Sequence, residues 1–266
     1  MGLTKKALMQ KQTKLGEIEI SNEGYEMKIV KYNNYNDIVI EFQDKYKTKV
    51  STRYQNFKKG QVKNPYHLSV FGVGYIGQGK YKISINGKTT KVYNYWRDML
   101  RRCYDPYYIN KELTYIDCYV CDEWLCFQNF GKWWEENVYD CNDEKIHLDK
   151  DILYKNNKIY SPKTCIFVPE RINFLFIKKD ANRGKYPIGV CWHKVIGKFY
   201  ASCSIFDEEN NRKQIHLGYY NTSEEAFLTY KQFKENYIKQ VADEYKDLIP
   251  QRLYDAMYKY EVEIND

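Results

Sequence analysis

The sequence predicts an α+β protein built from three modules, and the spacing of apolar residues along the chain indicates each of them. Short alternating strands predict a β-rich N-terminal module with a basic tail over residues 1–70. A strand, a turn, a second strand and a helix predict a compact core within residues 90–178. Three strands followed by a long helix predict a last module over residues 186–266, which also holds C-terminal helices.

The N-terminal strands are expected where MKIV, NDIVIEF and KTKVSTRY alternate or run apolar, with Asn-Asn and Gln-Asp turns between them. The glycine-rich segment that follows, residues 72–88, lacks the Gly-Lys-Ser/Thr ending of a phosphate-binding loop. We therefore expect a loop that crosses between modules.

A helix is predicted next, over YNYWRDMLRRCYDP, because its apolar residues recur at helical spacing. Arg97, Arg101 and Arg102 gather toward another face of this helix. They are either solvated or in contact with phosphate groups, which would set the register of a bound nucleic acid.

The stretch from Ile146 to Phe176 is the most informative part of the chain. Asp149 lies in the first strand, Asn156 and Asn157 supply the turn, and Pro169 opens the helix that carries Asn173. An acid on a strand and an amide on a helix are thereby directed toward one point. This order of elements suits a single divalent cation that binds a scissile phosphate.

These residues resemble the HNH (His-Me finger) endonucleases of bacteriophages and introns, including homing endonucleases. The resemblance implies a ββα-metal core, a DNA hydrolase activity and magnesium or manganese (Mg²⁺ or Mn²⁺) bound by Asp149 and Asn173. The general-base histidine of the family is replaced by Lys150, whose ammonium accepts no proton unless its pKa is strongly lowered. The catalytic candidates are therefore Asp149, Asn173, Lys150 and His147: the chain still cuts if Lys150 is a desolvated base or if His147, which shares a strand face with Asp149 but does not occupy the base position, reaches the site.

The last module resembles an AP2 domain, which is a three-stranded sheet backed by a helix and which lays its sheet in the DNA major groove. The matching residues are Gly189-Val190, the Gly197–Ala201 run, the Leu217–Tyr220 run and the Ser-Glu-Glu-Ala helix start. The resemblance implies double-stranded DNA as partner. The outward residues expected to contact it are Trp192, Lys194, Lys198, Tyr200, Ser202, Arg212 and Lys213. Lys178, Lys179 and Arg183, in the basic connector before this module, are further candidates.

Composition restricts the class of protein further. Hydrophobic residues make up 43% of the 266 residues, which argues against disorder, and a net charge of +7 is compatible with nucleic acid. The N-terminus has no signal peptide and no run is apolar enough to cross a bilayer, so we expect a soluble protein without a membrane partner. We therefore expect its eight cysteines to be reduced, in a cytoplasm. The resemblance to phage proteins implies that this is the cytoplasm of an infected bacterial host.

Cys118 and Cys121 have the spacing of a zinc knuckle, but a second such pair is missing, so we do not expect structural zinc. The segment around them instead favours an amphipathic helix with packed tryptophans. The alternative to an endonuclease is a degenerate HNH-like factor without catalysis that binds DNA or a host or phage protein, such as a phage regulator or an inhibitor of host defence. Position 150 separates the two hypotheses.

Overall fold

The computed structural model describes residues 13–177, 185–207 and 211–264, and it is a mixed α+β fold with several small sheets, as predicted. The chain forms two compact units, residues 1–134 and residues 135–266. This division differs from the three predicted modules, because the predicted central module is shared between the two units. Within the described residues, none of the helices is both long and apolar enough to span a membrane.

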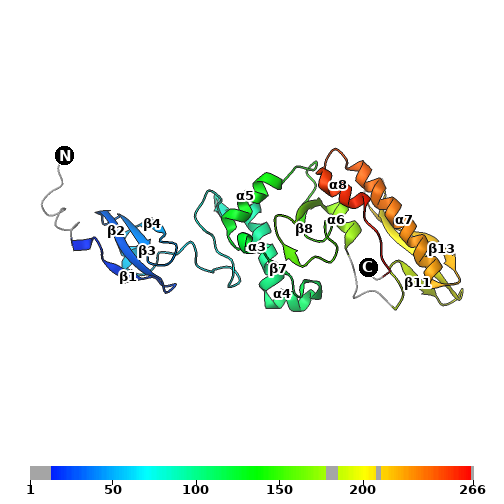
Figure 1. The fold of residues 1–266 in the computed structure, drawn as a ribbon, viewed down its shortest axis with the longest axis horizontal. Coiled ribbons are helices and arrows are strands. Elements are labelled where there is room, and N and C mark those ends of the chain that lie inside the picture. The colour runs from blue at the N-terminus through cyan, green and yellow to red at the C-terminus, as the bar shows by residue number, and fades with distance from the viewer. Residues whose placement is uncertain (1–12, 178–184, 208–210, 265–266) are drawn as a thin grey trace. The chain divides into compact units, whose positions relative to one another are not determined.

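Unit 1 begins with a four-stranded antiparallel sheet, labelled at the blue end of Figure 1, in which the strands pair in sequence order. The expected strands are confirmed. The strands are β1 (Ile18–Ile20), β2 (Glu26–Asn34), β3 (Asp37–Phe42) and β4 (Lys49–Thr52), and the short helix α2 (Tyr54–Lys58) follows.

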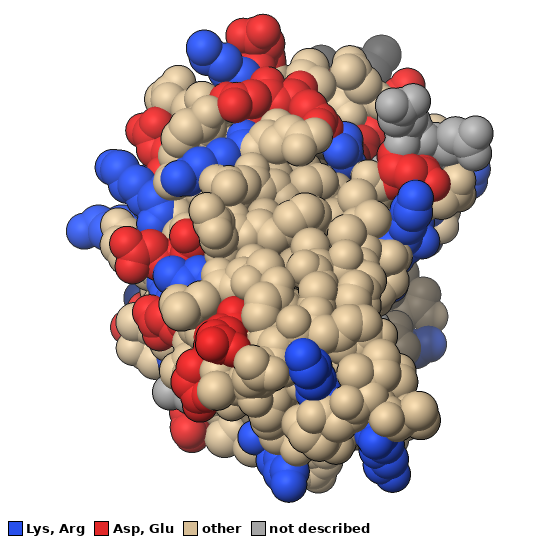
Figure 2. All heavy atoms as spheres, turned by 90° about the vertical axis from the view of Figure 1, so that its right-hand side faces the viewer, with Lys and Arg blue, Asp and Glu red and all other residues tan. Residues whose placement is uncertain are grey.

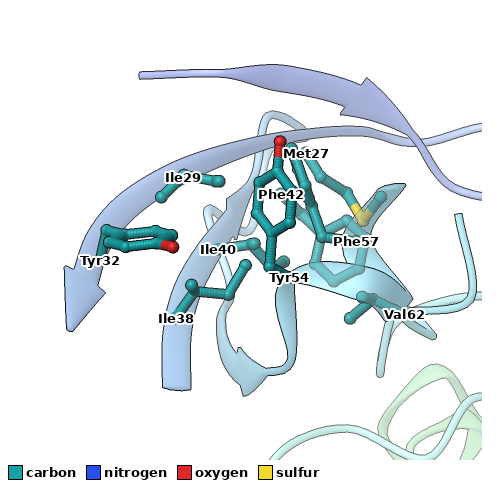
Figure 3. Close-up of a cluster of buried hydrophobic side chains, with 9 residues drawn as sticks. All are labelled: Met27, Ile29, Tyr32, Ile38, Ile40, Phe42, Tyr54, Phe57 and Val62. Carbon is teal, nitrogen blue, oxygen red and sulfur yellow. The ribbon is translucent and has the colours of Figure 1, made fainter. Parts of the chain in front are cut away.

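The core of this sheet follows from side-chain alternation, since residues two apart on a strand share a face. Met27 and Ile29 of β2 point to the same side as Ile38, Ile40 and Phe42 of β3, as Figure 3 shows. All five are essentially fully buried. Aromatic and aliphatic side chains close the cluster from the remaining elements: Tyr32, Tyr54, Phe57 and Val62.

The glycine-rich segment of unit 1 is packed against helices, which the prediction of a connecting loop did not anticipate. An added Cβ on Gly74 would meet Leu100 and Trp96, and one on Gly131 would lie 2.5 Å from the ring of Tyr81. A side chain at either position would clash with these neighbours, so glycine is the residue that fits at Gly74 and Gly131. After α2, unit 1 continues with β5 (Ser84–Ile85), β6 (Lys88–Thr89), α3 (Lys91–Tyr104), α4 (Pro106–Lys111), η1 (Leu113–Tyr115), β7 (Tyr119–Val120), η2 (Asp122–Leu125) and α5 (Phe127–Asn137).

Unit 2 contains the predicted strand–strand–helix order followed by the predicted sheet and helix. Strand β8 (Ile146–Asp149) pairs antiparallel with β10 (Ile166–Pro169), and α6 (Glu170–Phe176) follows directly. A second sheet follows, with strand order β11-β12-β13, and two helices come after it. The bounds are β9 (Ile159–Tyr160), β11 (Val190–His193), β12 (Lys198–Phe206), β13 (Arg212–Tyr220), α7 (Ser223–Glu244) and α8 (Gln251–Tyr258).

Helix α7 lies along one side of the three-stranded sheet (Figure 1). Thr222 is the N-cap of this helix: its Oγ1 accepts a hydrogen bond from the Glu225 amide, and the Glu225 carboxylate accepts one from the Thr222 amide. Val190, Ala201 and Cys203 of the sheet pack on the helix side chains Ala226, Phe227 and Tyr230.

Contacts inside unit 2 join the ββα core to this sheet and helix. Phe174 of α6 lies 5.0 Å from the Phe206 ring, centroid to centroid, and 4.0 Å below the Arg212 guanidinium. Arg171, also on α6, forms a 2.6 Å ion pair with Glu244 at the end of α7. Helix α6 is therefore in contact with both parts of the unit.

Gly189, just before β11, supports a first prediction about folding. Its φ is +75°, and an added Cβ would overlap the ring of Tyr230. Gly189→Ala should therefore lower the free energy of unfolding by about 3 kcal/mol, combining backbone strain with overpacking. Gly197→Ala is the matched control, because Gly197 has φ +69° but open space around it. Urea unfolding of both variants that gives equal losses would refute the packing argument.

Candidate metal centre and nucleic-acid interface

The ββα core places two polar side chains on one face of β8. Ile146 and Leu148 are buried on one side of the strand, while His147 and Asp149 point to the other and are half-buried. Asp149 pairs with Ile166 at the start of β10. Helix α6 packs against both strands. Its first residue, Glu170, approaches His147, so the start of the helix lies on the His147 and Asp149 side.

One oxygen of the Asp149 carboxylate is fixed by the backbone. Its Oδ1 accepts hydrogen bonds from the amides of Asp151, at 2.8 Å, and Ile152, at 2.7 Å. Its Oδ2 receives no hydrogen bond from any described residue. Burial raises the pKa of this carboxyl above its ordinary value, although the two amides act in the opposite direction. A desolvated carboxylate with one oxygen held and the other open suits a cation ligand.

Asn173 lies one turn inside α6, and its half-buried amide makes no hydrogen bond within the described part of the chain. An amide oxygen is a ligand that Mg²⁺ and related hard cations accept. An oriented carboxylate and an amide without a hydrogen bond to the described residues are both oxygen donors of the kind that the predicted ion takes.

Lys150 occupies a different environment. It is only 5% exposed, and its Nζ contacts both carboxylate oxygens of Asp151, at 2.8 and 2.7 Å, and donates to the Asn157 carbonyl at 2.7 Å. The Asn157 side chain in turn donates to the carbonyls of Lys150 and Ile159. A carboxylate partner favours the protonated form of a lysine. Lys150 is thus suited to hold the loop after β8.

His147 approaches a carboxylate as well. Its Nε2 lies 3.4 Å from Oε1 of Glu170, which also lies 3.9 Å from the Lys145 ammonium. Arg171, the next residue, donates its amide to Glu144, and Tyr245 of the last module donates its hydroxyl to the same carboxylate at 2.7 Å. The first turn of α6 is therefore held by charged and polar groups from both parts of unit 2.

The second candidate surface is the side of the β11–β13 sheet opposite α7, which we call the outer face. The strand register shows which residues point there, because paired residues share a side. His193, Tyr200, His216 and Tyr219 form a connected set of rings, with centroid distances from 4.6 to 6.2 Å. The outer face comprises Cys191, His193, Lys198, Tyr200, Ser202, Ser204, Gln214, His216 and Tyr219, and the Phe206 and Arg212 pair continues it at the end that Phe174 of α6 contacts.

Hydrogen bonds order the polar part of the outer face. Gln214 Nε2 donates to Ser202 Oγ at 2.8 Å, and Ser204 Oγ donates to the Gln214 amide oxygen at 3.2 Å. Figure 2 views the molecule from the side where β11 and β13 are labelled in Figure 1. Uncharged residues occupy the middle of that view, and lysine and arginine side chains stand toward its edges, interspersed at the top and left with aspartate and glutamate.

The predicted DNA-contacting residues of this module divide into two groups. Lys198, Tyr200 and Ser202 lie on the outer face, and Lys194 lies in the loop beside it. Trp192 does not lie on that face, because it pairs with Phe199 and packs on its ring at 4.8 Å on the helix side. Lys213 shares the helix side with Ile205, and Arg212 is stacked on Phe174.

The other predicted contacts lie elsewhere. Arg97 and Arg101 of α3 are 3.4 and 3.6 Å from the Asp98 carboxylate, and the guanidinium of Arg101 lies over the ring of Tyr108. Arg102 is stacked in the same way on Tyr115. These contacts occupy part of each guanidinium. Lys178, Lys179 and Arg183 lie outside the described residues.

Sequence inspection missed Cys191, His193, Ser204, Gln214, His216 and Tyr219. Simple alternation along β13 would have found Gln214 and His216, which lie two and four residues after Arg212 and so point to the same side of the strand. It would then have selected Gly218, since the register shifts between Ala201 and Ser202 of β12 and brings Tyr219 to the outer face instead.

The cysteines form no disulfide with one another: all eight are free, and most are buried. The described ranges contain no cluster of three or more His, Cys, Asp or Glu side chains that could hold a metal ion. A centre made of one carboxylate and one amide is smaller than such a cluster.

Comparisons with known proteins give no match: no family model, no curated protein and no solved structure is significantly similar to this chain.

Proposed function

We propose that this chain is a DNA-binding endonuclease that hydrolyses duplex DNA at the ββα core of unit 2. The observation that carries the proposal is the state of Asp149, a half-buried carboxylate with one oxygen held by two amides and the other without a hydrogen bond to the described residues. It lies on the strand face that α6 approaches, and α6 carries Asn173 with an amide free to ligate. The resemblance to HNH endonucleases supports the same assignment.

Asp149 and Asn173 would hold a Mg²⁺ or Mn²⁺ ion, which would polarise the scissile phosphate and stabilise the leaving oxygen. The two amides on Asp149 Oδ1 fix the direction of the carboxylate. The outer face would bind the duplex through its ring cluster and polar side chains, and Lys198 and Lys194 would contact phosphates.

A second candidate is a DNA-binding factor without hydrolysis, and the environment of Lys150 favours it. The ammonium at the position of the missing histidine is buried and held by Asp151 and Asn157, so this position supplies no proton acceptor. A factor of this kind, such as a regulator or an inhibitor of host defence, would keep the outer face and lose the chemistry.

A supercoiled plasmid distinguishes the two candidates. Nicking that requires Mg²⁺ or Mn²⁺ and stops with a chelator is expected for the endonuclease. A protein that binds the plasmid at low salt and leaves it supercoiled with either metal would establish the binding factor. A protein that neither binds nor cuts duplex DNA would refute both.

Lys150→Met tests whether this lysine is structural or catalytic. Removing the ammonium leaves the Asn157 carbonyl without its donor and Asp151 without its ion pair, so we expect the free energy of unfolding to fall by about 1–3 kcal/mol. Any nicking by the folded variant should remain within a few-fold of the wild-type rate. A variant of unchanged stability that has lost all nicking would instead identify Lys150 as a catalytic residue.

A further inference from the structure

The loop between β11 and β12 is a tight hairpin with a defined conformation. The Gly197 amide donates to the His193 carbonyl at 2.9 Å, and Gly197 adopts a φ of +69°. The Ile196 amide donates to Nδ1 of the His193 ring at 3.2 Å. Because the same ring contacts Tyr200 and Tyr219, the hairpin tip is fixed relative to the outer face.

Two branched apolar side chains stand at this tip. Val195 is 92% exposed, the highest value among the large hydrophobic side chains of the described residues, and Ile196 is 47% exposed. Neither belongs to the core cluster between the sheet and α7. Aliphatic side chains this exposed gain almost nothing from folding, since the hydrophobic contribution scales with the area removed from water.

The apolar tip is flanked by cations on both sides. Lys194 precedes Val195, Lys198 follows Gly197, and both side chains are exposed. Neither ammonium has an ion-pair partner in the part of the chain that the structure describes. Two lysines about one apolar pair match the chemistry of a duplex, in which phosphates lie on both sides of the stacked bases.

We infer that the Val195–Ile196 tip is a wedge that inserts between stacked base pairs and kinks the duplex bound to the outer face, with Lys194 and Lys198 on the flanking phosphates. This inference rests on the proposed binding of duplex DNA. Apolar wedges of this kind unstack a base step at a cost of a few kcal/mol and bend the duplex, which lets the protein contact more of it.

The lysines favour DNA over two other occupants of an apolar tip. A protein pocket that accepts Val195 and Ile196 has no requirement for a cation on each side. A lipid surface would accept both features, so it is included as an outcome of the test. The wedge also predicts a preference: a duplex that is already unstacked at one step costs less to deform and should bind more tightly.

The experiment uses the full chain and a 30-bp duplex with 2-aminopurine in a central TA step, in a matched and a mismatched form. The wild-type protein should increase the 2-aminopurine fluorescence and bind the mismatched duplex at least tenfold more tightly. The Val195→Ser, Ile196→Ser double variant should lose both effects and weaken on the matched duplex. Ile85→Ser, on the exposed β5–β6 hairpin of unit 1, is the control and should behave as wild type.

Each result decides the question. Duplex binding without a fluorescence change and without mismatch preference overturns the wedge and leaves the proposed function intact. Failure of the wild-type protein to bind either duplex overturns both. Binding to vesicles with an anionic lipid that depends on Val195 and Ile196, while the double variant keeps wild-type behaviour on DNA, assigns the tip to a lipid surface and overturns the wedge.

Discussion

Asp149→Asn is expected to abolish metal-dependent nicking while leaving duplex affinity unchanged. The asparagine oxygen still accepts hydrogen bonds from the amides of Asp151 and Ile152, so the turn after β8 keeps its geometry. The substitution removes the only carboxylate assigned to the cation, and the outer face is untouched. Loss of a metal ligand removes both the charge stabilisation and the positioning that the ion supplies, which together account for several kcal/mol of the barrier.

The same variant should be more stable than wild type in the absence of metal at neutral pH. Burial raises the pKa of Asp149 in the folded protein. An acid whose folded pKa is raised contributes its full stability below its unfolded pKa and loses it as the pH rises through the folded pKa. Ionised Asp149 therefore opposes folding at pH 7, and asparagine relieves this. Near pH 3 the Asp149 carboxyl is neutral in the folded and in the unfolded protein, so wild type and Asp149→Asn should have similar melting temperatures.

Divalent cations provide a readout that does not depend on cleavage. A ligand that binds only the folded state raises its stability by mass action, so Mg²⁺ or Mn²⁺ should raise the melting temperature of wild type and leave that of Asp149→Asn unchanged. Asp143→Asn, at an exposed carboxylate of the same unit, is the control and should respond to metal as wild type does. A variant that nicks DNA, or that gains as much from metal as wild type, would refute the assignment of Asp149.

Local signals in the sequence predicted the elements because the physical causes are themselves local. The Thr222 and Glu225 pair lies three residues apart and closes its capping box without help from elsewhere. Asn156 was predicted as a turn residue and has a φ of +62°, a conformation that asparagine tolerates better than most residues. The strand alternation around Met27 and Ile40 likewise predicted the sheet of unit 1.

Side-chain roles were harder to predict because they depend on distant partners. Trp192 was assigned to the DNA-binding face, whereas its pairing with Phe199 turns it toward the helix. Arg212 was assigned to phosphate, but Phe174, 38 positions earlier, lies beneath it. At Lys150, substitution of the expected histidine could be read from the sequence. The carboxylate and carbonyl that hold its ammonium could not.

The replacement of His216 and Tyr219 by serine is expected to weaken duplex binding by about 10–100-fold. Their rings lie 4.6 Å apart on the outer face, and Tyr219 is 42% exposed, so neither is needed for the core beneath α7. A side chain that contacts bases contributes about 1–3 kcal/mol of discrimination. Circular dichroism should show an unchanged fold.

The salt dependence of binding separates these rings from the lysines beside them. His216 and Tyr219 contact no phosphate in the proposed arrangement, so the serine double variant should keep the wild-type slope of log affinity against log salt. Lys198→Gln removes one phosphate contact and should reduce that slope by about 1, with a uniform loss across sequences. Lys213→Gln, on the helix side, should leave the slope unchanged.

Tyr107→Ser, at a 77% exposed tyrosine of unit 1, controls for loss of a surface ring. If fluorescence anisotropy at 50 and 200 mM salt shows that Tyr107→Ser weakens binding as much as the outer-face variant, then the sheet is not the surface that binds DNA.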